Sequence, residues 1–356
     1  MARLSRCLSL SFKTLSTITE VRGLMPLDSK LYQDDLIAVI PGNYREILID
    51  FCKTYTESLV QAGISVESYK PLFDDFFDLV KKQLQEPYAF EPIHQRVTAP
   101  VDYTRFGVEI IRPLVDMEAS SVQGLSNVDK MVQQMRRGEN VILLANHQIE
   151  VDPQIIHLLL EKEYERFAEE MVFVAGHRVT TDPLAAPFSL GRNLVCIYSR
   201  KHLDNPSEMK AEKQRHNARA MTLLVKLLAE GGKCVYVAPS GGRDRPNDKG
   251  KVEVAPFDPQ SIEMFRLIGI QSKRPTHFYP MAIDSYAVFP PPDKVQKELG
   301  EQRKVKRSGA HIAFCDEVDL KQLAELFPDA DKYQRRQAVA DNIWDIVKQE
   351  YARILS

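Results

Sequence analysis

The sequence of 356 residues contains no apolar run of the roughly 18 residues that a helix needs to cross a bilayer. It also has no excess of charge of one sign, because 47 basic and 49 acidic side chains give a formal net charge of −2. That balance excludes the broad basic field typical of nucleic-acid-binding proteins. We therefore expect a protein with no transmembrane span, with at most transient contact with a membrane surface, and with no nucleic-acid partner. Any anion-binding site must be local.

Cysteine is scarce, and no two of the five cysteines have the spacing of a metal site or a redox motif. Cys196 and Cys234 lie in apolar, strand-like runs, which indicates buried free thiols and a reducing compartment. The first 19 residues contain three basic and no acidic side chains, and they lack the apolar core of a secretory signal. This composition resembles an organelle transit peptide, although a short amino-terminal arm would look the same.

The residues from 41 to 118 show the apolar periodicity of helices. Asn43 and Glu46 predict a capping pair at the start of one helix, and Pro71 predicts the start of a second. Phenylalanine, tyrosine and leucine recur at helical spacing, which indicates packing in a core rather than ligand binding. We therefore expect an amino-terminal arm over residues 1–40 and a small helical bundle domain over residues 41–118.

The remainder of the chain, residues 119–356, alternates strand-like and helical segments without an internal repeat. The predicted strands are residues 141–145, 171–175, 194–198, 234–238, 278–283 and 311–314. This alternation predicts an α/β catalytic domain with a mainly parallel mixed sheet flanked by helices.

The first of these strands ends in Asn146-His147, and Asp152-Pro153 follows. Asp152 is predicted to be the N-cap of a helix with Pro153 as its first residue, so that His147 lies in a strand-to-helix loop. Open α/β sheets bind their ligands at such loops. Across a tight turn, the Asp152 carboxylate can accept a hydrogen bond from one imidazole nitrogen and leave the other as a base. The alternative is that Asp152 only caps the helix and His147 is an ordinary loop residue.

Two further predicted strands end in loops that are rich in cations. Their basic side chains are Lys201, His202, Arg243 and Arg245. If the strands are parallel to the first, these loops lie at the same edge of the sheet as His147. A cluster of this kind suits a phosphate dianion, because arginine offers a planar fork and lysine a point charge. The alternative is a set of solvated loop charges, with Asp244 neutralising one arginine.

These segments resemble the glycerol-3-phosphate 1-O-acyltransferases of the soluble plastid type and their bacterial relatives. Residues 146–153 resemble the family's His-x4-Asp motif, and residues 238–246, Ala-Pro-Ser-Gly-Gly-Arg-Asp-Arg-Pro, are the most specific match. The resemblance is strong from about residue 100 to residue 293 and weaker on both sides. Membrane-bound relatives usually have glutamate where this chain has Ser240, which favours the soluble type over a lysophosphatidate acyltransferase.

The resemblance implies transfer of a fatty acyl group from an acyl carrier protein or coenzyme A thioester to the sn-1 hydroxyl of glycerol 3-phosphate. The product would be 1-acyl-glycerol 3-phosphate, in the first step of phospholipid synthesis. In this family His147 would be the general base and Asp152 its partner. The phosphate would be held by Lys201, His202, Arg243 and Arg245. We expect direct transfer by a monomer, with no metal and no cofactor.

Several alternatives stay open at this point. The chain could acylate lysophosphatidate, or it could be a non-catalytic phosphate- or lipid-binding module. A third alternative is a hydrolase in which His147, Asp152 and His177 bind a metal. A basic helix face could dock an acidic carrier protein, or it could simply be solvated; it comprises Lys210, Lys213, Arg215 and Arg219. The chain begins close to where mature plastid enzymes of this type begin, so we expect a bacterial cytoplasm first and plastid stroma second.

Overall fold

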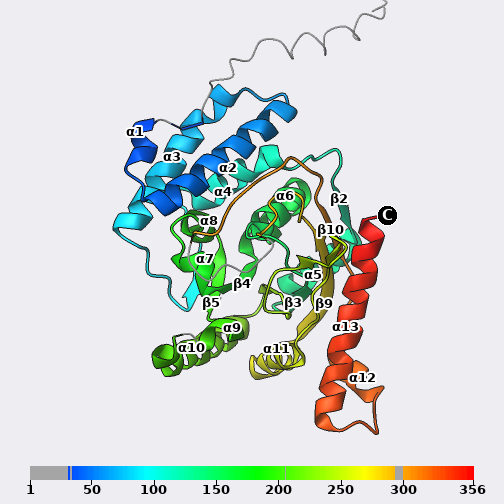
Figure 1. Cartoon of the computed structure of the whole chain (residues 1–356). Helices are drawn as coiled ribbons and strands as arrows, with labels where there is room; N and C mark the ends of the chain where they lie inside the picture. The colour runs from blue at the N-terminus through cyan, green and yellow to red at the C-terminus, as the bar shows by residue number, and fades with distance from the viewer. Residues whose placement is uncertain (1–30, 33, 205, 293–299) are drawn as a thin grey trace, which may run out of the picture.

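The computed structural model describes residues 31–32, 34–204, 206–292 and 300–356 (Figure 1). The side chains of Leu36, Arg200 and Lys201 also lie outside this description. The expectations for residues 1–30, including the transit-peptide composition, therefore fall on residues that the structure does not describe.

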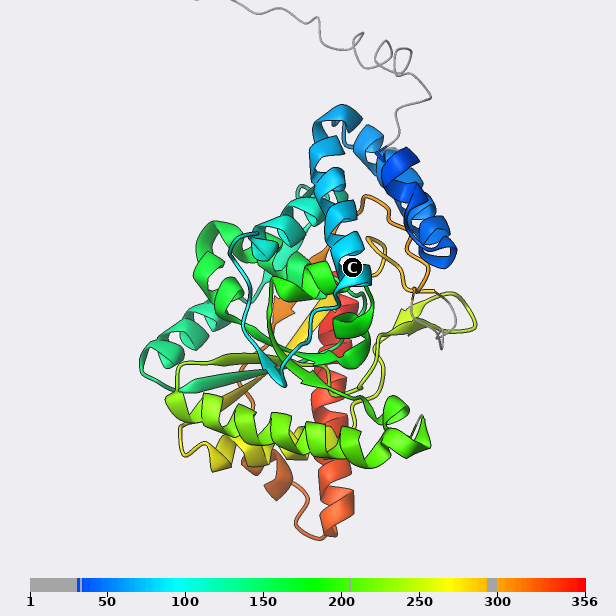
Figure 2. The same ribbon diagram turned by 90° about the vertical axis from the view of Figure 1, so that its left-hand side faces the viewer.

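The amino-terminal half begins with a group of helices, which Figures 1 and 2 both show in blue and cyan at one end of the molecule. They are α1 (Asp34–Ala38), α2 (Gly42–Gln61), α3 (Val66–Gln85), α4 (Tyr103–Ile111) and the 3₁₀ helix η2 (Arg112–Leu114). The predicted capping pair is wrong, because the N-cap of α2 is Pro41 and makes no side-chain cap. The predicted start at Pro71 is also wrong. Helix α3 begins at the buried Val66 and tolerates Pro71 inside, at the cost of one backbone hydrogen bond.

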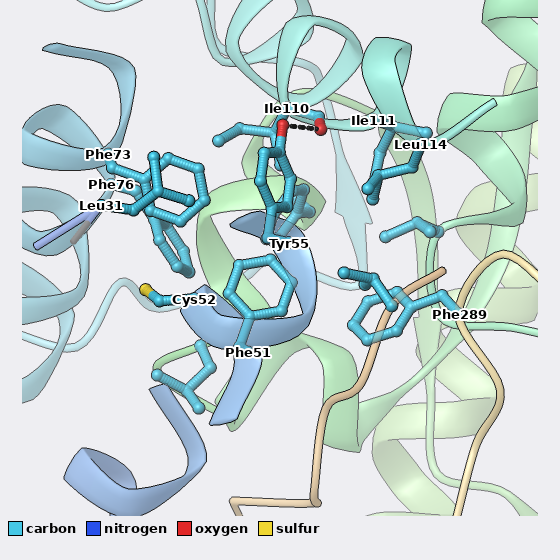
Figure 3. Close-up of a cluster of buried hydrophobic side chains, with 14 of the residues drawn as sticks. Leu31, Phe51, Cys52, Tyr55, Phe73, Phe76, Ile110, Ile111, Leu114 and Phe289 are labelled. Carbon is cyan, nitrogen blue, oxygen red and sulfur yellow. Dashed lines mark hydrogen bonds between the residues drawn. The ribbon is translucent and has the colours of Figure 1, made fainter. Parts of the chain in front are cut away.

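Aromatic side chains fill the core of this helical region, as their spacing predicted (Figure 3). The Tyr55 hydroxyl donates a hydrogen bond of 2.6 Å to the Ile110 carbonyl oxygen, which satisfies a buried polar group. The ring centroid of Phe76 lies 6.1 Å from that of Phe106 and 5.8 Å from that of Phe188. Phe289, from much later in the chain, belongs to the same cluster. The helices and the α/β part therefore share one core, and the domain boundary at residue 118 stays a prediction.

The described residues form a main sheet of eight strands in the order β1-β5-β4-β6-β3-β9-β10-β2. The strands are β1 (Ile93–His94), β2 (Ser121–Gln123), β3 (Asn140–Ala145), β4 (Val172–Gly176), β5 (Asn193–Ile197), β6 (Cys234–Val237), β9 (Thr276–Asp284) and β10 (His311–Phe314). Strands β5, β4, β6, β3 and β9 run parallel. Strand β1 is antiparallel to β5, whereas β10 is antiparallel to β9 and parallel to β2. A mainly parallel mixed sheet is thus confirmed, and β1 adds a strand from a region predicted to be entirely helical.

Helices cover both faces of this sheet. One face packs against α5 (Leu125–Arg136) and α6 (Asp152–Glu170), and the other packs against α10 (Lys210–Glu230), α11 (Pro259–Gln271) and α13 (Lys332–Ile354). The shorter elements are α7 (His177–Thr181), α8 (Ala186–Leu190), α9 (Arg200–Leu203), η3 (Ser207–Met209), β7 (Arg245–Pro246), β8 (Val252–Glu253) and α12 (Leu320–Glu325). Cys196 and Cys234 are buried free thiols, as predicted.

The parallel strands bring the carboxyl ends of β3, β4, β5 and β6 to one edge of the sheet. This confirms the expectation that the three sequence-selected loops share an edge, and it adds the loop after β4. The buried Asp244 carboxylate ties two of these loops together. It accepts hydrogen bonds from the side-chain amides of Asn146 at 2.8 Å and Gln148 at 3.3 Å, and from the Ala255 N–H at 2.9 Å. Both Asp244 oxygens thus accept from amides, and the carboxylate acts on Arg245 only through its charge, which raises the pKa of that arginine against the larger, lowering effect of burial.

Burial raises the pKa of Asp244 to about 6, since the loss of hydration outweighs the hydrogen bonds from Ala255, Asn146 and Gln148. The same two amide side chains reach the strand beyond β3. Asn146 bonds to the backbone of Ile283, and the Gln148 side-chain oxygen accepts from the Ser285 N–H at 2.8 Å. The loop that carries His147 is thus held from both neighbouring strands.

Replacement of Phe76 by alanine should lower the free energy of unfolding by about 3–5 kcal/mol, because it leaves a cavity where α3 meets α4 and α8. Urea unfolding followed by circular dichroism measures this loss. A change below about 1 kcal/mol would show that the aromatic cluster does not join these helices.

Asp244→Asn should change how stability depends on pH. Folding raises the Asp244 pKa above its unfolded value, so the stabilising contribution of this carboxyl is complete below about pH 4 and is lost as the pH rises through about 6. Relative to the variant, the wild type should therefore lose stability of order 1–3 kcal/mol between these limits. Urea titrations of both proteins over this range provide the measurement, and a constant difference between them would contradict the raised pKa.

Candidate active site

His147 and Asp152 form a hydrogen-bonded pair in the loop between β3 and α6. Nδ1 of His147 lies 2.8 Å from Oδ2 of Asp152. The carboxylate is fully buried, whereas the imidazole keeps about 29% of its side-chain surface exposed. Because the carboxylate accepts at this position, Nδ1 of the neutral imidazole carries the proton and Nε2 is left as the basic nitrogen.

Asp152 is the first residue of α6 and not its N-cap, so this prediction is wrong by one residue. Val151 is the N-cap and makes no side-chain hydrogen bond. The Asp152 carboxylate turns back into the loop, where Oδ2 also accepts from the backbone N–H groups of Gln148 at 2.8 Å and Ile149 at 3.3 Å. The carboxylate therefore folds the loop around His147 instead of only capping the helix.

Ser285 is a third member of this group that the sequence did not single out. Its hydroxyl donates a hydrogen bond of 2.6 Å to Oδ1 of Asp152. Ser285 directly follows β9, which is parallel to β3. The carboxyl ends of parallel strands meet at one edge of the sheet, and this rule, which selected the other loops, would also have selected Ser285. Both Asp152 oxygens are thus occupied by hydrogen-bond donors, which counts against the alternative in which Asp152 ligates a metal.

A cavity of about 310 Å³ opens beside His147, a volume within the range of ligand pockets. The predicted site residues that line it are His147, Asp152, His202, Arg243 and Arg245. The remaining one, Lys201, lies in the short helix α9, and its side chain is outside the described part of the chain. Apolar side chains from three neighbouring strands form another part of the wall, namely Phe173, Leu194 and Tyr236.

Four arginines line the cavity, and the two that the sequence predicts to bind phosphate, Arg243 and Arg245, differ in their partners. Nη2 of Arg243 donates to both carboxylate oxygens of Glu301, at 2.7 and 2.6 Å. Nη1 of Arg245 donates to the backbone oxygen of Asp244 at 3.1 Å, and its buried Nε has no hydrogen-bond partner among the described residues. Burial lowers the pKa of Arg245, and the nearby charge of Arg243 lowers it further. The sequence did not identify Glu301, which lies 58 residues beyond Arg243 in no recognisable motif.

His177 also lines the cavity, at the start of α7. Its ring centroid lies 5.0 Å from those of His202 and Tyr198. Burial, with the charges of His202 and Lys213 next in effect, lowers the His177 pKa to about 4, so this imidazole is neutral near pH 7. Lys213 itself is buried and donates to the backbone oxygen of His202 at 2.8 Å. It therefore does not belong to the basic surface that was considered for docking a carrier protein.

Comparison with known proteins identifies the family to which the chain belongs. The acyltransferase family model matches residues 121–284, which contain every site residue selected from the sequence. The chain is 37% identical to a chloroplastic glycerol-3-phosphate acyltransferase of Spinacia oleracea, over 85% of this chain and 65% of the relative. The corresponding proteins of Arabidopsis thaliana and Pisum sativum are 34% and 37% identical, over 94% and 96% of this chain.

The chain spans about two thirds to three quarters of these relatives, with 65% of the spinach protein, 73% of the Arabidopsis protein and 75% of the pea protein covered. Within the described residues, no helix combines the length and the apolar character that crossing a bilayer requires. The identity and its extent, together with the matching family model, show that this chain belongs to the glycerol-3-phosphate acyltransferase family.

Proposed function

We propose that this acyltransferase moves a fatty acyl group from a thioester to the sn-1 hydroxyl of glycerol 3-phosphate and releases 1-acyl-glycerol 3-phosphate. The observation that carries the proposal is one cavity that contains the His147–Asp152 pair together with Arg243 and Arg245. A base beside an anion-binding group suits an alcohol that also carries a phosphate. Holding both ends of such a substrate removes translational and rotational entropy from the barrier.

In this mechanism Nε2 of His147 removes the proton of the substrate hydroxyl, and the oxygen attacks the thioester carbonyl carbon. The tetrahedral oxyanion then collapses and breaks the carbon–sulfur bond. The departing thiolate takes the proton back from the imidazolium, so that the base is regenerated. Asp152 stabilises the imidazolium through its 2.8 Å contact with Nδ1, and Ser285 holds Asp152 in place. No covalent acyl-enzyme is needed, because the substrate oxygen is itself the nucleophile.

The phosphate would bind Arg245 and Arg243, with His202 and Lys201 completing the site. Arg245 supports this role best, because its side chain is half-buried and the hydrogen bond that it makes within the described residues goes to a neutral carbonyl oxygen. A dianion would add negative charge at this partly desolvated guanidinium, where charge-assisted hydrogen bonds are strong.

The acyl donor is proposed to be a thioester of acyl carrier protein or of coenzyme A. The basic face of α10 gives little support to carrier docking, since Lys210 pairs with Asp204 at 2.8 Å and Arg219 lies 3.6 Å from Glu91. The relatives named above are chloroplastic, which supports the plastid stroma and gives no support to a bacterial cytoplasm. A monomeric state stays a proposal.

His147→Ala should lower kcat about 10²–10⁴-fold, because the variant has no general base, while glycerol 3-phosphate binding stays nearly unchanged. An acyl-transfer assay with either glycerol 3-phosphate or lysophosphatidate as acceptor, and with both thioester types, gives the rate. Calorimetry gives the Kd for glycerol 3-phosphate. Wild type should acylate glycerol 3-phosphate and not lysophosphatidate.

Ser285→Ala serves as the matched control, since it removes one hydrogen bond from Asp152 but keeps the imidazole–carboxylate contact. It should reduce kcat far less than His147→Ala does. If His147→Ala keeps the wild-type rate, the base has been assigned to the wrong residue.

Arg245→Ala should raise the KM for glycerol 3-phosphate about 10–100-fold, the loss expected for one or two charge-assisted hydrogen bonds. The kcat at saturating substrate should change much less, because the base is intact. Steady-state kinetics at constant ionic strength separate the two constants. An unchanged KM would argue against phosphate binding at Arg245.

A further inference from the structure

Glu301 places a carboxylate on one of the two arginines proposed to bind phosphate. Both of its oxygens lie within 2.7 Å of Nη2 of Arg243, and both side chains line the cavity beside His147. The pair is largely withdrawn from water, with 8% of the Glu301 side chain and 19% of the Arg243 side chain exposed. A charge-assisted pair in such a place is strong, so Glu301 is a serious competitor for any other anion at Arg243.

The backbone at Glu301 is fixed from two sides. The Gly300 N–H donates to Oδ2 of Asp182 at 3.0 Å, and the Glu301 carbonyl oxygen accepts from Nη1 of Arg303 at 2.9 Å. Arg303 is itself buried between the carboxylates of Asp182 and Glu150. Because these contacts hold the main chain, the Glu301 carboxylate can leave Arg243 by rotation of its own side chain, without movement of the segment.

The guanidinium groups of Arg243 and Arg245 are therefore unequal before a ligand arrives. The Arg243 charge is balanced by Glu301, whereas the side-chain hydrogen bond that Arg245 makes within the described residues goes to a backbone oxygen. A monoanion can use Arg245 alone, but it gains little from Arg243 while the carboxylate remains there. A phosphate dianion that spans both groups can replace the carboxylate and offset the lost ion pair.

We propose that Glu301 occupies the place on Arg243 that a phosphate monoester takes, and that the ligand must displace this carboxylate to bind. Glu301 is then a specificity-determining residue, because it weakens every anion that cannot engage both arginines. The inference rests on the proposed function, because that function identifies the ligand as a phosphate monoester. The Glu301–Arg243 ion pair itself does not depend on acyl transfer.

Glu301→Gln tests the proposal, since the amide keeps the size of the side chain and removes its charge. Calorimetry with inorganic phosphate as the probe should give a Kd about three- to tenfold lower than that of the wild type. The KM for glycerol 3-phosphate should fall in parallel. Glu253→Gln is the control: it removes a negative charge from β8, opposite Arg245 in the β7–β8 pairing, and leaves the Arg243 pair intact. Its Kd for phosphate should stay within about twofold of the wild-type value.

An unchanged or higher Kd in a folded Glu301→Gln protein would overturn the proposal, because a carboxylate that merely orients Arg243 would help phosphate binding. If wild type binds phosphate too weakly to measure, binding that appears in the variant supports the proposal, and its absence in both proteins refutes it. Should the glutamine variant not fold, Glu301→Asp draws the carboxylate back by one methylene and should also lower the Kd. A wild type that binds phosphate but transfers no acyl group would contradict the proposed function and leave this inference standing.

Discussion

The buried carboxylate of Asp152 is the group on which the geometry of the site depends. It accepts hydrogen bonds from the imidazole of His147, from backbone N–H groups of the loop and from the hydroxyl of Ser285. A charged group can remain in such a dry place only when its oxygens are fully hydrogen-bonded. The cost of leaving this carboxylate unsatisfied therefore fixes the loop, the start of α6 and the end of β9 relative to one another.

A second buried acid, Asp244, performs a similar task between β3 and β6, but through amide groups in place of an imidazole. A third, Glu301, faces an arginine. The sequence around the cavity suggests a strongly cationic site, and the structure shows that acids are interleaved with the cations. The electrostatic field in the cavity therefore depends on how acids pair with basic side chains and on how far burial removes both from water. The number of basic residues alone overstates the positive potential.

Much of this arrangement follows from the sequence. Parallel strands place their carboxyl ends together, so the loops that carry His147, His202 and Arg243 could be assigned to one edge before any coordinates were known. The position of Asp152 at the helix start was missed by one residue, since N-cap and first-turn aspartates look alike in sequence. Glu301 could not be predicted, because it reaches Arg243 through a long-range contact that has no local pattern.

The pairing of β1 with β5 joins the amino-terminal helical region to one edge of the main sheet. Ile93 and His94 reach the sheet from the stretch between α3 and α4 and cover the outer edge of β5, the strand that leads into α9. Without that cover, β5 would present unpaired backbone groups, which invite association with other chains. A fragment that carried the sheet without residues 93–94 would therefore expose this edge of β5, and it should associate with other chains unless that stretch is kept with it.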